Sequence, residues 1–187
     1  MTLSRTATLF LASVAVGAIA VCAALGVPRW RAARELPAHP LALGVAVSQQ
    51  LRPQAMGTAA GRFATVIDMR PDGEAVGQPS SQEMAAAATA HHLQFAYVPV
   101  PHGDIPDAVV DRLSAAMAAR PGPVLLYCRS GRRAARSWSL LEASRPGGLG
   151  VDEILAAVAA SGQDASDLRP RLEQRVRARH APAGAGA

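Results

Sequence analysis

The residues of this sequence most capable of chemistry are a cysteine and the arginines after it, in YCRSGRRAARSW from Tyr127 to Trp138. Cys128 ends the apolar run PVLLY, and Gly131 and Arg133 occupy the fourth and sixth places counted from the cysteine. A thiolate is a strong nucleophile, and a guanidinium can bind an oxyanion through two parallel hydrogen bonds. The spacing therefore indicates nucleophilic attack by Cys128 on a small anion held near Arg133.

The alternative interpretation of this segment is structural. A core thiol at the end of a strand, followed by arginines that face solvent, has the same composition. The joint occurrence of strand, cysteine, glycine and arginine favours the nucleophile. We therefore assign the catalytic roles to Cys128 and Arg133. The rest of the loop is assigned to substrate binding, namely Arg129, Ser130, Gly131, Arg132 and Ala134.

The elements that must position this loop alternate along the chain. Short apolar runs predict strands over 41–48, 63–69, 94–100 and 123–128, and helical patterns cover 80–92, 104–119, 132–144, 151–161 and 164–179. We expect an α/β fold, a mainly parallel central sheet flanked by helices, with ligands at the carboxyl ends of the strands. A helix beginning after Gly131 would aim unpaired amides at the sulfur and stabilise a thiolate there.

Other polar residues fall at the same edge of the predicted sheet. Asp68, Arg70, Asp72 and Glu74 end the second apolar run and can line the cleft, although RPDGE is also a good turn. His102 and Asp104 follow the third run, and either can protonate a leaving group. Asp104 is also the predicted N-cap of its helix, and Ser80 with Glu83 predicts a capping box.

Three segments carry a resemblance to a known family: VIDMRPDGEAVGQPSSQEM, YCRSGRRAARSW and EILAAVAASGQDASDLRPRLEQR. Together they resemble the phosphatase-like domain of bacterial beta-lactamase hydrolase-like proteins, a family also described as sulfur transferases. The likeness covers about Val45 to Arg177. It implies the fold of dual-specificity and tyrosine phosphatases, whereas the loop CRSGRR resembles that of single-domain rhodaneses, which carry a persulfide on the cysteine.

The choice between sulfur and phosphoryl transfer depends on three positions. The phosphatase signature places arginine at position 134, where this chain has alanine, and usually histidine at position 127, where it has tyrosine. It also places an acidic aspartate near His102. We therefore expect a sulfurtransferase that forms a Cys128 persulfide from thiosulfate or a low-molecular-weight persulfide and passes it to a thiol, cyanide or sulfite. The alternatives are a cysteine-dependent phosphatase with a phosphocysteine, and a noncatalytic module that binds sulfane sulfur or an anion.

The remaining expectations concern organisation. Residues 8–27 carry no charge, which predicts an N-terminal transmembrane helix, or alternatively a signal peptide. We divide the chain into a membrane anchor with a basic flank (1–34), a linker (35–40), the catalytic domain (41–180) and a disordered tail (181–187). The arginines after the apolar segment place the domain on the cytoplasmic side of a bacterial inner membrane, with the periplasm as the alternative.

Composition limits the partners. The net charge of +5 comes from arginines beside the apolar segment and near the C-terminus. With 4% aromatic residues there is little for bases to stack on, so we expect no nucleic acid partner. His91 and His92 have no second ligand pair, so we expect no metal and no cofactor. The expected partners are a small sulfur-containing anion or persulfide, the membrane, and enzymes of sulfide oxidation.

Overall fold

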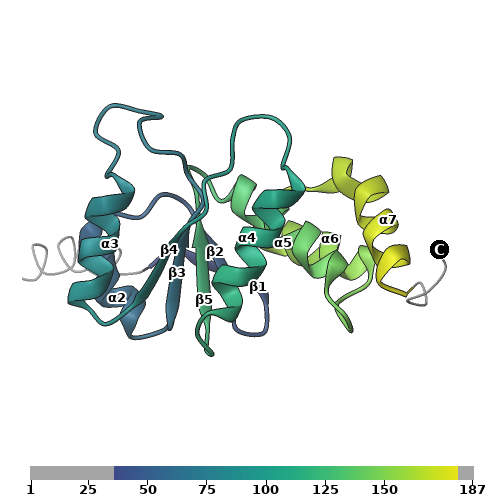
Figure 1. Cartoon of the computed structure of the whole chain (residues 1–187), viewed down its shortest axis with the longest axis horizontal. Coiled ribbons are helices and arrows are strands. Elements are labelled where there is room, and N and C mark those ends of the chain that lie inside the picture. The colour runs from purple at the N-terminus through teal and green to yellow at the C-terminus, as the bar shows by residue number, and fades with distance from the viewer. Residues whose placement is uncertain (1–35, 181–187) are drawn as a thin grey trace, which may run out of the picture. The chain divides into compact units, whose positions relative to one another are not determined.

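The central sheet in the computed structural model, which describes residues 36–180, is built from short apolar segments (Figure 1). Its strands lie in the order β1, β2, β5, β3, β4. Three of the four strand pairs are parallel, and only β1 runs antiparallel to its neighbour β2. The sheet is therefore mainly parallel, as predicted. The strand bounds are β1 Ala38–Ala42, β2 Val45–Ser48, β3 Thr65–Asp68, β4 Gln94–Tyr97 and β5 Val124–Tyr127.

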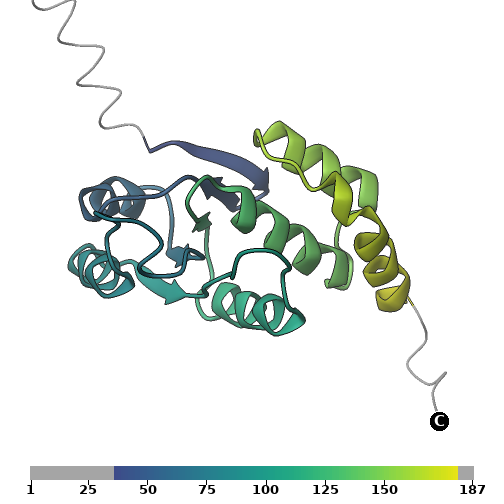
Figure 2. The same cartoon turned by 90° about the horizontal axis from the view of Figure 1, so that it is seen from above.

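Helices cover both faces of the sheet (Figure 2). On one face, Met56 and Met84 pack in one core cluster with Val66 and Leu125. On the other face, helix residues pack around Ile67, Leu126 and Cys128. Because side chains alternate along a strand, Leu125 and Leu126 fill opposite cores. The helices are η1 Pro53–Ala55, α2 Met56–Ala60 and α3 Ser81–Ala90 on the first face, and α4 Asp107–Ala118, α5 Arg132–Ser144, α6 Val151–Ala160, η2 Ser166–Leu168 and α7 Arg169–His180 on the second side.

Two expectations for the start of the domain were wrong. Residues 41–48 form a hairpin rather than one strand, because Gly44 turns the chain at a φ of 75° between β1 and β2. Strand β1 starts at Ala38, inside the segment expected to be a linker. Pro40 is tolerated there because β1 is an edge strand that pairs only with β2.

Helices α3, α5 and α6 begin where the sequence predicted, whereas α4 and α7 do not. Ser80 and Glu83 form the predicted capping box of α3. The predicted N-cap Asp104 was wrong, because α4 begins at Asp107 with Pro106 as its N-cap. A residue before proline is disfavoured in helical conformation, which excludes Ile105 from the helix. The last helix likewise begins at Arg169 rather than at residue 164, after the short turn η2.

The expected anchor (1–34) and tail (181–187) lie outside the described residues. Among residues 36–180, no helix has both the length and the apolar character needed to cross a bilayer.

Candidate active site

The cysteine loop, residues 128–133, joins the end of β5 to the first turn of α5. The side chains of β5 are fully buried, so the loop starts from a rigid strand at the middle of the sheet. Gly131 is the N-cap of α5 and has a φ of 91°, which L residues rarely adopt. Glycine at this place therefore lets the chain turn sharply from strand into helix.

The carbonyls and amides of the cysteine loop are used differently. The Arg129 carbonyl accepts a hydrogen bond from the Gln50 amide at 3.3 Å, and the Ser130 carbonyl accepts one from Gln163 Nε2 at 3.2 Å. By contrast, the backbone amides of residues 129–134 find no acceptor among residues 36–180. Unpaired amides at the start of a helix attract anions. The loop is therefore a ready anion-binding site.

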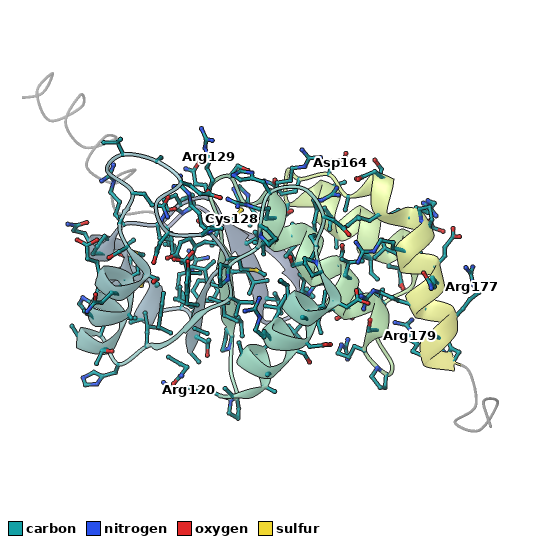
Figure 3. All side chains as sticks on the ribbon, turned by 45° about the horizontal axis from the view of Figure 1, so that its top comes forward. Arg120, Cys128, Arg129, Asp164, Arg177 and Arg179 are labelled. Atoms are coloured by element: carbon teal, nitrogen blue, oxygen red, sulfur yellow. The ribbon has the colours of Figure 1, made fainter. Side chains whose placement is uncertain are left out.

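The surroundings of Cys128 have features of both interpretations of this residue, the structural core thiol and the catalytic nucleophile. The residue is 1% exposed and belongs to the core cluster beneath α4 and α5, as a structural thiol would. Yet it also begins the anion-binding loop and lies close enough to Arg133 to raise the pKa of that guanidinium, after the larger effect of Glu74. In Figure 3, Cys128 lies inside the molecule and Arg129 lies above it at the outer edge, which we call the rim. An anion can reach the sulfur only if rim side chains shift.

The Arg133 guanidinium uses three of its N–H groups in contacts within the protein and leaves two free among the described residues. Nη1 donates to Glu74 Oε1 at 2.5 Å and to the Val100 carbonyl at 2.9 Å, and Nη2 donates to Glu74 Oε2 at 2.8 Å. A guanidinium has five N–H groups, so Nε–H and one N–H of Nη2 are left without an acceptor in the described part of the chain. These two lie on the same edge of the planar group. That edge can grip two oxygens of a bound anion.

Glu74 contacts three basic side chains near the cysteine loop. Besides Arg133, it accepts from Arg70 Nε at 2.9 Å, and His102 Nε2 lies 3.1 Å from its Oε1. The hydrogen bonds from Arg133 and then Arg70 outweigh burial and lower the pKa of Glu74 to about 2. The carboxylate therefore stays charged at physiological pH and fixes the orientation of two guanidinium groups.

Asp68 lies beneath the site rather than in it. Its side chain is 1% exposed and accepts a hydrogen bond from the Arg70 amide at 2.9 Å. Burial is the main cause that raises its pKa to about 6. Burial and the Asp68 charge also raise the pKa of Tyr127, whose hydroxyl has no partner among the described residues. Asp68 thus shapes the turn that carries Arg70 and Glu74.

The other predicted site residues divide into two groups. His102 reaches the site through Glu74, with its side chain 78% exposed. Asp104 does not, because its Oδ1 accepts from Arg171 Nη1 at 2.6 Å on α7. The side chains of the remaining loop residues do not point at the sulfur as a set: Arg129, Ser130 and Arg132 are exposed, and Ala134 is buried.

Sequence reasoning missed the residues that brace the loop from elsewhere. Glu74 was expected to line the cleft, but its contact with Arg133 was not predicted, and Gln50 and Gln163 were not assigned any role. Gln50 follows β2 and Gln163 follows α6, so only the folded chain brings them to the loop. No local motif marks either glutamine.

The fold and the site define a phosphatase-like α/β domain with a cysteine loop between the central strand and a helix. Residues 39–145 match the family described as beta-lactamase hydrolase-like protein, phosphatase-like domain, and the chain belongs to this family. A beta-lactamase hydrolase-like protein of Xylella fastidiosa is 35% identical over 114 residues, which are 61% of this chain and 26% of that protein. The chain therefore spans about a quarter of the length of this relative.

Solved structures share the fold. A candidate phosphatase from Neisseria meningitidis is 27% identical with a TM-score of 0.66, covering 75% of this chain and 99% of that one. The catalytic core of the PP-IP phosphatase SIW14 from S. cerevisiae has a TM-score of 0.56 at 12% identity, with 74% and 84% covered. The domain is thus a cysteine-dependent enzyme of the phosphatase-like class. These comparisons favour the phosphatase alternative over the sulfurtransferase that the sequence led us to expect.

Proposed function

We propose that the domain is a cysteine-dependent phosphatase that cleaves a small phosphate monoester through a phosphocysteine on Cys128. The observation that carries this proposal is that Arg133, which interacts with Cys128 and has a free guanidinium edge, belongs to a loop whose backbone amides 129–134 have no acceptor among residues 36–180. Together these donors match the three oxygens of a phosphoryl group. The phosphatase names of the family and of its structural neighbours support the same class.

In the first step, the Cys128 thiolate attacks phosphorus in line with the leaving oxygen. An S–P bond forms as the O–P bond breaks, while the amides and the Arg133 edge bind the three other oxygens. The leaving oxygen needs a proton. His102 is the candidate donor, because its exposed imidazole lies at the mouth of the site, 3.1 Å from Glu74.

In the second step, water attacks the phosphorus of the phosphocysteine, and the S–P bond breaks to return the thiolate and release phosphate. The neutral His102 left by the first step accepts the proton of this water. Both steps require that the side chains over the buried sulfur give way when the anion enters. Glu74 and Arg133 are 10% and 16% exposed and hold each other in place, so the movement falls to the exposed side chains of the loop, such as Arg129.

Sulfur transfer remains a second candidate on one specific observation. Arg133 stands at the sixth place of the loop. Position 134, the seventh place, is a buried alanine, whose methyl side chain cannot donate a hydrogen bond to an anion. A shorter loop favours a smaller group than phosphoryl. In this case thiosulfate would leave one sulfur on Cys128 and depart as sulfite, without the help of an acid.

One paired assay separates the candidates. Purified protein is given an aryl phosphate in one reaction, and thiosulfate with cyanide in the other, with Cys128→Ser protein as the control. We expect aryl phosphate turnover that Cys128→Ser abolishes. Thiocyanate formation without phosphate release would replace the phosphatase by the sulfurtransferase. Activity retained in Cys128→Ser protein would contradict both.

A further inference from the structure

A cavity of about 290 Å³ lies beside the cysteine loop and is lined by three arginines. We call it the arginine cavity; Arg52, Arg70 and Arg129 supply its positive charge, and Gln50, Gln78 and Val76 are among its other lining residues. Among residues 36–180, no acidic side chain lines it. Three like charges around one hollow repel one another, so an anion bound there would be stabilised by all three.

Arg70 is the fixed member of this set. Its side chain is 6% exposed and is held by Glu74 through Nε and by Gln50 Oε1 through Nη1, each at 2.9 Å. Its Nη2 donates to no acceptor among residues 36–180. A buried guanidinium with free N–H groups at a cavity wall is a costly arrangement unless a ligand completes it.

Arg52 and Arg129, the other two arginines of the cavity, have side chains that can move toward a ligand. Both are exposed, and neither forms an ion pair within the described part of the chain. Arg129 directly follows Cys128, and Figure 3 shows its side chain on the rim above the cysteine. Because Glu74 links Arg70 to Arg133, the arginine cavity and the cysteine loop are two neighbouring anion sites.

We propose that the arginine cavity binds a second anionic group of the substrate, so that the substrate is a small molecule with one group at Cys128 and another anion at Arg52, Arg70 and Arg129. This inference rests on the proposed function and narrows its substrate class. The volume suits a single charged group with its short linker rather than a large moiety.

Binding to Cys128→Ser protein tests the cavity without depending on turnover. Calorimetry compares butanediol bisphosphate with butanediol monophosphate, first in this background and then with Arg52→Gln added. Arg52 lies outside the cysteine loop, and the matched control is Arg120→Gln, an exposed arginine at the opposite edge of the domain (Figure 3). We expect the bisphosphate to bind about 10-fold to 100-fold more tightly, and Arg52→Gln alone to remove that advantage.

Equal affinity for the two compounds, or an advantage that survives Arg52→Gln, would overturn the inference. Failure of the proposed phosphatase function would give a different result from failure of the arginine cavity. Tight, Arg52-dependent bisphosphate binding without turnover by wild-type protein would keep the cavity and reject the phosphatase. Turnover of aryl phosphate by wild-type protein without any preference for the bisphosphate would keep the phosphatase and reject the cavity.

Discussion

Glu74 accepts hydrogen bonds from both terminal nitrogens of Arg133, at 2.5 Å from Nη1 and 2.8 Å from Nη2. This contact joins the turn after β3 to the helix that follows the cysteine loop, 59 residues further along the chain. It uses the edge of the guanidinium formed by the two terminal nitrogens and leaves the edge formed by Nε and Nη2 without an acceptor among residues 36–180. The arginine is thereby oriented before any anion arrives.

Glu74→Gln tests this orientation. The amide cannot accept from both nitrogens, so we expect kcat/KM to fall about 100-fold through misplacement of Arg133. Because the pKa of Glu74 is lowered to about 2, its stabilisation of the fold is present above pH 4.5 and is lost as the pH falls toward 2. Urea unfolding should thus show a stability gap between wild type and variant at pH 7 that closes in acid. Glu153→Gln, which alters a capping acid on α6, is the control and should keep full activity.

Arg133→Lys retains the charge but removes the two-pronged edge. We expect kcat/KM to fall on the order of 100-fold or more, because a lysine cannot hold two oxygens of one anion in fixed positions. Arg132→Lys is the matched control, since Arg132 is the exposed neighbour on the same helix turn. Equal losses in the two variants, measured by steady-state kinetics, would show that the loss does not come from the free edge of Arg133.

Gly131→Ala probes the turn of the cysteine loop. The added methyl would lie 3.1 Å from Gln163 Nε2 and 3.4 Å from the Ser48 carbonyl, at a φ of 91°. We expect a loss of about 1–2 kcal/mol in the free energy of unfolding and a strong loss of activity, because the amides are re-aimed. Gly147→Ala meets no atom within 4 Å at a φ of 67°, so it should cost similar stability in thermal unfolding and leave turnover intact.

Asp68→Asn should stabilise the protein at neutral pH. Burial raises the pKa of Asp68 from 3.8 to about 6, so the folded state holds this proton more tightly than the unfolded state does. Stability therefore falls as the pH rises from about 4 to about 6. We expect the variant to gain about 1–3 kcal/mol at pH 7.5 and almost nothing at pH 4, by chemical denaturation. An equal change at both values would show that packing, rather than charge, limits this position.

The sheet and the cysteine loop were predictable because their signals are local. Short segments with apolar residues at their centre predicted β3 and β5, and Gly131 indicated the turn after Cys128. The hairpin at Gly44 was missed because the apolar run continues through it, and the side chain of Leu43 points into solvent. A turn inside an apolar run leaves little trace in the pattern of hydrophobic residues.

The bracing of the site could not be predicted, because it is formed by contacts between distant segments. Nothing near Glu74 indicates that Arg133 will bind it, and nothing near Asp104 indicates that Arg171 on α7 will draw it away from the cleft. The choice between sulfur and phosphoryl transfer also depended on whether a local or a global feature was considered. Loop length favoured sulfur transfer from the sequence, whereas the family and the fold favour the phosphatase class.

The proposed chemistry requires that Cys128 attacks the substrate and carries the transferred group. Rapid quenching during turnover of an aryl phosphate, followed by intact-mass and peptide mass spectrometry, tests it most directly. We predict a phosphoryl group on the peptide containing Cys128 and none in Cys128→Ser protein. Turnover with an unmodified Cys128 at every quench time, or with the group on another residue, would contradict the account.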